Sequence, residues 1–500
     1  MARRRLHEVL SGRRLTRLEY EHALPVLQGQ MLDAQFELRQ EAARAVLLIV
    51  SGIPAAGRSE VVNEVLGWLD PKFVTVQGFK TCSDAERERP PMWRFWRVLP
   101  PRGRLAILHG GWYQDLLQQA LEHEGSAKQL GARLQRPVER IVQLERMLAQ
   151  DGFTVAKVHL HVSPETQRKR LEKLRAEKTT RWRVTAEDRR MCRRYREVER
   201  ALEHCLDATD HPSAPWLLVD GTDAQHRALE VGRRLLQALQ AATPVAAVAR
   251  TAGARPGRRP SLVRKSASQA APAATASEQQ YDRELERLQG RLALLSRRKR
   301  FAQHAVVAVF EGMDAAGKGG AIRRITAALD ARQFHVVPIS APSPEELARP
   351  YLGRFWSQLP PRGNYTIFDR SWYGRVLVER VRRLTPTRDW RRAYDEIVEF
   401  ERQLDEHGVV VVKFWLAVSR EEQLERFNER DRNPLKRFKV DPEDWANRKH
   451  WDAYRRAAQD MIARTDTRHA RWTVVPADDK RQARLQVLRT LGDRIEAALD

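Results

Sequence analysis

The chain has 500 residues, of which 42% are apolar and 31% charged, and its formal net charge is +24 at pH 7. Such a length predicts about two to four domains, each large enough to bury a core, and the composition excludes a disordered or fibrous chain. No run of eighteen apolar residues occurs, which excludes a transmembrane helix.

The cysteines and the charge limit the class of protein further. Cys82, Cys192 and Cys205 follow no pattern that predicts disulfides or a zinc site, and the basic first residues lack the apolar region of a secretory signal. We therefore expect a cytoplasmic protein. The basic balance favours an anionic partner, which could be nucleic acid, a membrane surface or a polyanionic substrate.

The sequence repeats itself once. Residues 94–113 and 354–373 are identical at 11 of 20 positions with an offset of 260, and later matches continue with an offset of 256. An Ala/Pro-rich segment, 241–280, separates the two copies and is predicted to be a linker. A repeat this long indicates two related domains, 1–240 and 281–500.

Each copy runs through the same predicted elements in chain order. An amphipathic helix precedes an apolar strand that ends in a glycine turn, and further strands and helices alternate after it. The expected ranges are 16–44 and 282–303 for the first helix, 45–50 and 305–310 for the first strand, and 365–368, 409–416 and 472–475 for later strands of the second copy. Apolar strands that alternate with helices predict a parallel sheet covered on both faces, hence two tandem three-layer α/β/α domains.

The first strand of the second copy leads into a phosphate-binding motif. The sequence there is Glu311-Gly312-Met313-Asp314-Ala315-Ala316-Gly317-Lys318-Gly319-Gly320, which contains G-x-x-x-x-G-K between a strand and a helix, as in a P-loop. Backbone N–H groups of such a loop surround phosphate oxygens, and Lys318 would neutralise the transferring group. The residues predicted to bind phosphate in this loop are Gly312, Ala315, Ala316, Gly317, Lys318, Gly319 and Gly320.

Two residues depart from the usual motif. Gly319 stands where Ser or Thr normally supplies a hydroxyl to magnesium, and Asp314 places a carboxylate inside the loop. A negative charge repels phosphate unless it binds a cation or a proton, so we interpret Asp314 as a metal ligand or as a base for the acceptor phosphate. The alternative is that Asp314 caps the following helix.

Two further segments add charged groups. Asp369 and Arg370 follow the strand at 365–368, where a parallel sheet binds ligands, so Asp369 suits a second magnesium ligand and Arg370 a phosphate oxygen. Surface ion pairs look the same in a sequence. Around Asn433-Pro434 the chain predicts either a basic lid over phosphates or a solvated helix–loop–helix, with cations at Arg426, Arg430, Arg432, Lys436, Arg437 and Lys439.

These motifs together resemble the polyphosphate kinase 2 family. The resemblance is carried by residues 310–322, by 368–381 and by the lid around Asn433-Pro434; it covers 281–500 and, more weakly, 15–240. The two-domain layout is similar to the polyphosphate:AMP phosphotransferase subgroup. The resemblance implies P-loop kinase-like domains with a helical lid. It also implies transfer of a phosphoryl group from polyphosphate to AMP with Mg²⁺, for which Mn²⁺ could substitute.

The resemblance also implies residue roles. Asp314 and Asp369 would bind metal and serve catalysis, and Lys318, Arg370 and Arg430 would hold phosphates, as would Lys436 and Arg437 of the lid. Trp356, Arg375 and Glu379 are candidates for a nucleotide pocket. We expect in-line transfer without a phosphorylated protein intermediate, because His450 is the sole histidine in these motifs.

The first copy lacks the expected chemistry. Pro54 and Arg58 replace Asp314 and Lys318, and the remaining replacements are His109-Gly110 for Asp369-Arg370 and Leu174 and Thr180 for Arg430 and Lys436. Both carboxylates are absent together, as expected after loss of metal binding. We interpret this half as a degenerate domain that packs against the active one as in a dimer, and that could extend the basic track for polyphosphate.

Other functions stay open at this stage. The same motifs suit an ATP-dependent nucleotide or metabolite kinase, or a kinase that converts ADP to ATP with polyphosphate. Charge alone suits a nucleic-acid-binding protein, but no nucleic-acid module is recognised, and we expect neither nucleic acid nor membrane as a partner. A scaffold without activity is the last alternative. A homo-oligomer and a pseudo-dimeric monomer are both compatible with the sequence.

Overall fold

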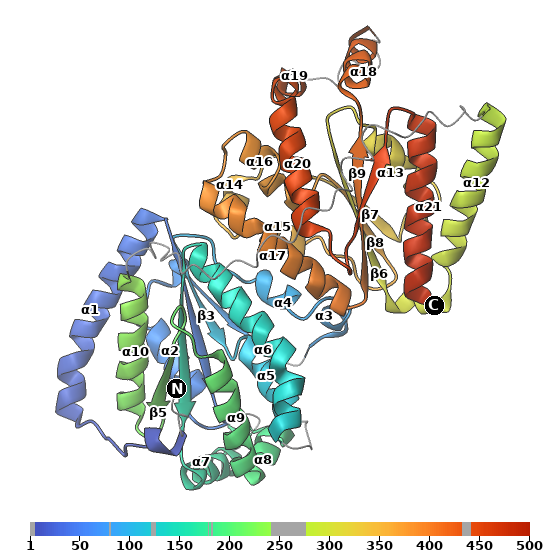
Figure 1. Cartoon of the computed structure of the whole chain (residues 1–500). Helices are drawn as coiled ribbons and strands as arrows, with labels where there is room; N and C mark the ends of the chain where they lie inside the picture. Colours follow the sequence, from blue (N-terminus) through green and yellow to red (C-terminus); the bar gives the residue numbers. More distant parts are fainter. Residues whose placement is uncertain are drawn as a thin grey trace. The chain divides into compact units, whose positions relative to one another are not determined.

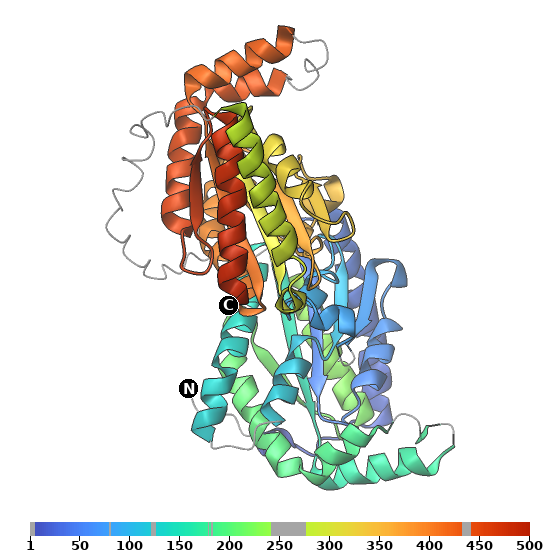
Figure 2. The same cartoon turned by 90° about the vertical axis from the view of Figure 1, so that its right-hand side faces the viewer.

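The structure is a computed structural model that describes residues 6–79, 82–121, 127–178, 180–181, 184–241, 277–432 and 442–500 (Figures 1 and 2). The chain divides into two compact units. The first comprises Met1–Cys82, Arg94–Ala249 and Pro344–Pro350, and the second Ser83–Trp93, Arg250–Ser343 and Tyr351–Asp500. Within the described ranges no helix has the length and apolar character needed to cross a membrane.

The N-terminal half contains a five-stranded sheet in the order β2-β3-β1-β4-β5, with every pair of strands parallel. Its strands are β1 (Ala45–Gly52), β2 (Val74–Gly78), β3 (Leu105–His109), β4 (Phe153–His161) and β5 (Trp216–Asp220). Its helices are η1 (Leu6–Val9), α1 (Arg17–Glu41), α2 (Arg58–Leu66), η2 (Pro71–Phe73), α3 (Asp84–Arg87), α4 (Trp93–Trp96), α5 (Trp112–Leu121), α6 (Ala127–Gln150), α7 (Pro164–Ala176), α8 (Ala186–Arg193), α9 (Tyr195–Thr209) and α10 (Ala224–Gln240).

The C-terminal half contains a second parallel sheet in the order β7-β8-β6-β9-β10. Its strands are β6 (Ala305–Gly312), β7 (Phe334–Pro338), β8 (Tyr365–Asp369), β9 (Val409–Ala417) and β10 (Trp472–Pro476). Its helices are α12 (Glu278–Leu295), η4 (Lys299–Gln303), α13 (Lys318–Thr326), α14 (Pro344–Leu347), α15 (Gly353–Trp356), η5 (Trp372–Arg375), α16 (Val378–Val381), α17 (Thr387–Glu406), α18 (Arg420–Arg432), α19 (Pro442–Lys449), α20 (Trp451–Thr465) and α21 (Lys480–Leu499).

The two sheets have the same register, residue for residue. Gly52 at the end of β1 pairs with Leu160 of β4, and Gly312 at the end of β6 pairs with Leu416 of β9. The offsets of 260 and 256 seen in the sequence are therefore also the offsets of the sheet ladders. This identity lets each residue of one half be compared with its counterpart in the other.

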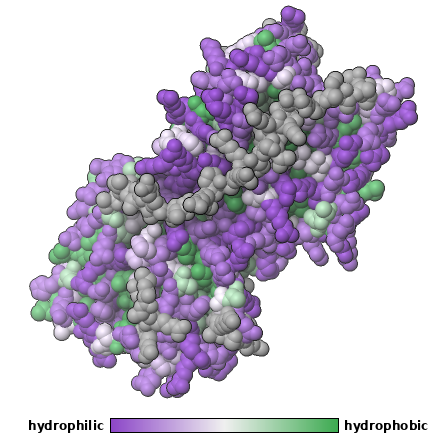
Figure 3. Space-filling view, in the orientation of Figure 1, coloured by the Kyte–Doolittle hydropathy of each residue, from purple (hydrophilic) through white to green (hydrophobic). Residues whose placement is uncertain are grey.

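Helices cover both faces of each sheet, which confirms the predicted α/β class. In the second half α12 and α21 lie side by side on one face, and α17 and α20 cover the other (Figures 1 and 2). The central strand β6 is buried along its whole length because both faces are covered. The face drawn in Figure 3 is mostly hydrophilic. On α1 the large apolar residues Leu18, Val26, Leu32 and Phe36 are exposed.

The first helix of the second half differs from its predicted range of 282–303. It begins at Glu278, inside the segment expected to be linker, because Ser277 and Gln280 form a capping box. It ends at Leu295, after which η4 leads into the sheet. The Ser296 hydroxyl follows the last turn and bonds to the Leu292 carbonyl oxygen, which satisfies a group at the helix end.

In each half a buried ion pair joins a strand of the sheet to the helix that precedes it. The Lys413 ammonium donates to Glu401 Oε2 at 2.7 Å and to the Tyr373 hydroxyl oxygen at 2.8 Å, and the side chains of Lys413 and Glu401 are fully buried. In the first half Lys157 and Glu145 form the same pair at 2.8 Å, also fully buried. Because the pair is present in the half that lacks the acids of the motif, we assign it to the fold rather than to catalysis.

Candidate functional site

The P-loop of the second half has the backbone that its sequence predicts. Gly312 has φ 150°, and a Cβ there would lie 2.6 Å from the Leu416 carbonyl oxygen, so only glycine fits. Ala315 has φ 58°, and Gly317 with φ 100° is the N-cap of α13. The interpretation of Asp314 as a helix cap is therefore wrong. The loop wraps the N-terminus of α13, whose N–H groups are suited to bind anions.

Two side chains of α18 donate hydrogen bonds to backbone carbonyl oxygens of this loop. Arg426 donates from Nη1 to the Ala315 carbonyl oxygen at 2.9 Å and from Nη2 to the Ala477 carbonyl oxygen at 2.6 Å. Gln423 donates to the carbonyl oxygen of Asp314 at 2.9 Å. Arg426 is only 2% exposed, so its prediction as a lid cation is wrong: burial beneath the loop makes it an anchor of the backbone.

The predicted acids and Arg370 meet at the carboxyl edge of the sheet. Asp369 ends β8 and pairs with Phe310 of β6, two residues before Gly312. Arg370 follows it and donates from Nη2 to Asp314 Oδ1 at 2.8 Å, while Asn447 of α19 donates to Asp314 Oδ2 at 2.9 Å. Both carboxylate oxygens of Asp314 are therefore engaged by groups from two other segments.

Asn447 is a site residue that the sequence analysis missed. One signal could have identified it, because its counterpart in the first half is Met191, just as the counterpart of Asp314 is Pro54. The amide and the carboxylate it contacts are thus both replaced in the same half. By contrast Gln423 and Arg426, which hold backbone oxygens, keep their identity as Gln167 and Arg170.

The acidic residues fit a magnesium site that is completed by substrate. The described part of the chain contains no group of three or more His, Cys, Asp or Glu residues placed to hold a metal ion. Mg²⁺ in phosphate-transfer sites commonly uses one or two carboxylates together with waters and phosphate oxygens. Asp314 and Asp369 supply two carboxylates, and within the described ranges the Asp369 carboxylate has no hydrogen-bond or ion-pair partner.

The side chains predicted to hold phosphates differ in where they lie relative to the P-loop. Lys318 is 9% exposed and donates to the carbonyl oxygens of Gly312 and Met313 at 3.1 and 3.3 Å, so its ammonium lies inside the curve of the loop. Arg430 lines a pocket beside the loop. The predicted lid cations Lys436 and Arg437 lie outside the described residues.

Glu311 is a buried acidic residue at the end of β6, directly before the P-loop. It is 3% exposed and accepts a hydrogen bond from the Ser371 hydroxyl at 2.8 Å. Burial raises the pKa of the Glu311 carboxyl from 4.5 to about 7, and the hydrogen bond from Ser371 and the charges of Lys318 and Arg370 oppose part of that rise. The counterpart in the first half is Ser51, so this carboxyl is absent where the acids are absent.

The pKa of Glu311 predicts a pH dependence of stability. Between pH 4.5 and 7 the folded state binds more protons at this group than the unfolded state, so stability falls as pH rises through that window. The loss amounts to roughly 3 kcal/mol when complete. Glu311→Gln should flatten the dependence of the urea midpoint between pH 5 and 8, with Glu286→Gln on an exposed part of α12 as the control. An unchanged slope in Glu311→Gln would contradict the raised pKa.

The three candidates for a nucleotide pocket are not all brought together. Arg375 and Glu379 form an ion pair at 3.2 Å, and the Arg375 guanidinium lies 4.4 Å from the centre of the Tyr351 ring. Trp356 is 1% exposed, with its ring 4.9 Å from that of Phe400 in the core. The expectation that Trp356 contacts a nucleotide is therefore corrected, since the side chain packs between elements of the fold.

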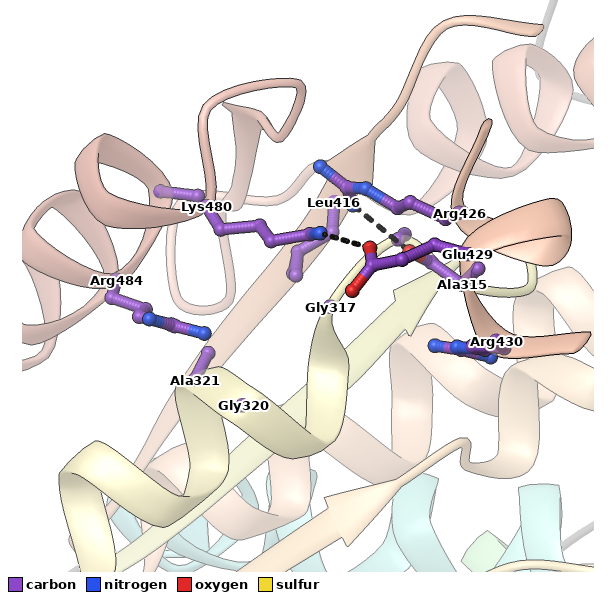
Figure 4. Close-up of a pocket in the computed structure, with 12 residues that line it drawn as sticks. Ala315, Gly317, Gly320, Ala321, Leu416, Arg426, Glu429, Arg430, Lys480 and Arg484 are labelled. Atoms are coloured by element: carbon purple, nitrogen blue, oxygen red, sulfur yellow. Dashed lines mark hydrogen bonds and ion pairs between the residues drawn. The ribbon is translucent and has the colours of Figure 1, made fainter. Parts of the chain in front are cut away.

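A pocket of about 220 Å³ opens beside the loop, between α13, α18 and α21 (Figure 4). Figure 4 shows Lys480 and Arg484 on one side of the first turn of α13, and Arg426, Glu429 and Arg430 on the other. The Lys480 ammonium lies 3.5 Å from a Glu429 carboxylate oxygen. The pocket is lined by Ala315, Ala316, Gly317, Gly320, Ala321, Leu416, Arg426, Glu429, Arg430, Lys480, Ala483 and Arg484.

The loop of the first half keeps the same shape without the acids. Gly52, Ala55 and Gly57 have φ of 155°, 60° and 96°, each close to the value of its counterpart. Arg170 donates to the Ala55 carbonyl oxygen at 2.9 Å, and Gln167 donates to the Pro54 carbonyl oxygen at 3.1 Å. The shape of the loop therefore depends on its glycines and on these two anchors.

Comparisons with known proteins agree with this duplicated architecture. The family described as Polyphosphate kinase 2 (PPK2) matches residues 14–246 and 275–500. A protein of Pseudomonas aeruginosa named "Polyphosphate:AMP phosphotransferase" is 46% identical over 491 residues, which cover 97% of this chain and 98% of that one. A protein of Acinetobacter johnsonii with the same name is 35% identical over 476 residues, which cover 94% and 96%.

A solved structure shares the whole architecture. It comes from Pseudomonas aeruginosa PA01 and is described as a polyphosphate kinase 2. It matches with a TM-score of 0.86 and 44% identity, and the match covers 99% of each chain. Both halves of the chain are therefore included in the match.

Proposed function

The chain belongs to the polyphosphate kinase 2 family, and from this premise we propose that it transfers the terminal phosphoryl group of inorganic polyphosphate to AMP, giving ADP. The observation that carries the proposal is the meeting of Asp314, Asp369 and Arg370 beside the P-loop. These groups occur in residues 281–500 only, so we place the chemistry in that half. The full-length relatives named as polyphosphate:AMP phosphotransferases support the choice of donor and acceptor.

The reaction needs two anions to approach each other. An oxygen of the AMP phosphate attacks the terminal phosphorus of the donor, the bond from that phosphorus to the next bridging oxygen breaks, and the donor leaves one phosphate shorter. During such a transfer negative charge is spread over the three equatorial oxygens and develops on the leaving oxygen. Lys318, Arg370 and the loop N–H groups stabilise that charge. Arg430 adds a third cationic side chain beside the loop.

Mg²⁺ is the proposed cofactor, with Mn²⁺ as a substitute. Asp314 and Asp369 would hold it, and the ion would supply positive charge between donor and acceptor phosphates. Before an ion binds, Arg370 and Asn447 occupy the oxygens of Asp314. The two donors orient the carboxylate in the loop.

The net charge of +24 is consistent with a polyanionic donor. Polyphosphate carries roughly one charge per phosphate, as a nucleic-acid backbone does, so a basic surface attracts and retains it. Arg375 and Glu379, which follow Arg370 along the chain, are the proposed side chains on the acceptor side. A conventional ATP-dependent kinase would not require so large an excess of cations.

One assay tests the proposal. The purified full chain is incubated with AMP, Mg²⁺ and long-chain polyphosphate, and the nucleotides are separated. We expect ADP to form, and we expect removal of divalent ions with EDTA to abolish its formation until Mg²⁺ or Mn²⁺ is restored. Parallel reactions replace polyphosphate with ATP, or AMP with ADP. ADP formation from AMP with ATP alone would contradict the proposed donor, and activity on ADP alone would contradict the proposed acceptor.

A further inference from the structure

The two carboxylate oxygens of Asp314 have partners of different charge. Oδ1 accepts a hydrogen bond from the Arg370 guanidinium at 2.8 Å, and Oδ2 accepts one from the neutral amide of Asn447 at 2.9 Å. The Asp314 side chain is 13% exposed, whereas the Arg370 side chain is 46% exposed. The guanidinium therefore has solvent beside it, into which it can move away from the carboxylate.

The helix that carries Asn447, α19, is fixed to α18 by contacts close to that residue. The next residue, Arg448, donates to Gln423 Oε1 of α18 at 2.9 Å. Two residues before Asn447, the Trp445 ring lies 5.1 Å from the ring of Phe427, which has no exposed surface. Because both contacts hold α19 in place, the amide of Asn447 is presented to the loop from a fixed backbone.

The same helix also acts on the backbone of Asp314. Gln423 is 2% exposed and donates from Nε2 to the Asp314 carbonyl oxygen at 2.9 Å, while its Oε1 accepts the hydrogen bond from Arg448. Two consecutive residues of α19 thus reach Asp314 by different routes. Asn447 holds the carboxylate directly, and Arg448 holds the backbone through Gln423.

The first half shows what these contacts are for. At an offset of 256, α7 and α8 have the same bounds as α18 and α19, so the pair of helices is kept. In α8 the two residues are replaced by Met191 and Cys192. Gln167 still donates to the loop at 3.1 Å, but its Oε1 is buried and has no hydrogen-bond partner among the described residues. The α19 contacts are therefore lost where the acid is lost, although the helices remain.

The two partners of Asp314 would respond differently to a divalent ion. A guanidinium and a divalent cation repel each other at the same carboxylate oxygen. An amide is neutral and can donate to one oxygen while an ion binds the other, as groups behind metal ligands commonly do. Arg370 is the exposed and charged partner, and Asn447 is the neutral partner on a fixed helix. The ion is thus expected to displace Arg370 and to leave Asn447 in place.

We propose that Asn447 is a positioning residue that keeps Oδ2 of Asp314 throughout, while Oδ1 exchanges its partner from Arg370 to a divalent ion. The inference rests on the proposed function, because it takes Asp314 as a ligand of the ion. The exchange frees the Arg370 guanidinium to move to the oxygens of the transferring phosphate. Before the ion binds, the same guanidinium is occupied by the carboxylate.

The test measures ion binding in the absence of any reaction. Mn²⁺ is titrated into the full chain without polyphosphate or nucleotide, and bound Mn²⁺ is followed by the relaxation rate of water protons. Asn447→Met should raise the Kd for Mn²⁺ about tenfold or more, because the carboxylate loses the group that orients it. Arg370→Met should lower the Kd, by up to about fivefold, because a competing cation is removed.

Three further variants serve as controls. Asn428→Met makes the same substitution at an exposed position of α18, and Arg297→Met removes an exposed arginine that follows α12. Both should leave the Kd unchanged. Asp314→Asn should abolish Mn²⁺ binding at this site. Asn447→Met copies the residue that α8 has at the same position, so the substitution is compatible with the fold.

The outcomes separate this inference from the proposed function. A Kd for Asn447→Met equal to that of Asn428→Met would overturn the role of Asn447. A Kd for Arg370→Met at or above that of Arg297→Met would overturn the exchange, and so would a wild type that binds Mn²⁺ no better than Asp314→Asn. Shifts of opposite sign support the inference. Failure of the wild type to form ADP from AMP and polyphosphate, with these shifts intact, would overturn the proposed function instead.

Discussion

Replacing Asp314 by Asn should reduce ADP formation by roughly a thousandfold or more, because a preorganised charged group at the transferring phosphates is lost. Asn keeps the size of the side chain and can still accept a hydrogen bond from Arg370, so the loop should remain folded. The measurement is the rate of ADP formation from AMP and polyphosphate with saturating Mg²⁺. Circular dichroism and the melting temperature should match those of the wild type.

The control for this prediction is Asp282→Asn, which removes a carboxylate from an exposed position of α12. It should leave the rate unchanged. Substantial phosphoryl transfer by Asp314→Asn would show that the first half, where Pro54 occupies the same position, carries out catalysis. That result would contradict the assignment of the chemistry to residues 281–500.

Replacing Lys413 by Met should destabilise the second half by about 3–5 kcal/mol, because Glu401 would be left as a buried charge without its partner. Both side chains are fully buried, and the ammonium also bonds to the Thr465 carbonyl oxygen at 2.8 Å. The measurement is urea unfolding followed by tryptophan fluorescence, in which Trp472, packed 4.7 Å from the Tyr373 ring, reports on this region.

A second substitution at the same site separates charge from packing. Adding Glu401→Gln to Lys413→Met removes the orphaned carboxylate and should recover part of the lost stability. In the first half Lys157→Met should give a loss of similar size, since Lys157 contacts Glu145 and Thr209 in the same way. If Lys413→Met alone unfolded at the wild-type midpoint, the pair would make no net contribution and its role in the fold would be refuted.

The fold was predictable because its signals are local. Each strand is an apolar run, and the glycines of the P-loop are required by backbone geometry that Gly312 and Gly317 show in their φ angles. The internal repeat added a second, independent copy of every signal. Element ends were less predictable: the capping box at Ser277 lies in a segment whose Ala/Ser/Pro composition is typical of a linker.

The contacts around Asp314 were not predictable from patterns along the chain. Arg370 comes from the end of β8 and Asn447 from α19, so their meeting depends on how three separate segments pack. The same holds for Arg426, whose position among other lid cations suggested an exposed role, although its side chain is buried beneath the loop. Trp356 was misplaced for a related reason, because an aromatic residue near a motif is often part of the core.

The left-handed backbone at Ala315 has a consequence for how donors bind. Its counterpart Ala55 has φ of 60°, although that half has neither the acids nor the lysine of the motif. A conformation unfavourable for alanine is thus kept where Asp314, Asp369 and Lys318 have all been replaced, and in both halves an arginine anchors the alanine carbonyl oxygen. An incoming phosphate therefore meets a loop whose backbone already has its binding conformation. Little conformational entropy of the loop is then lost when the phosphate binds.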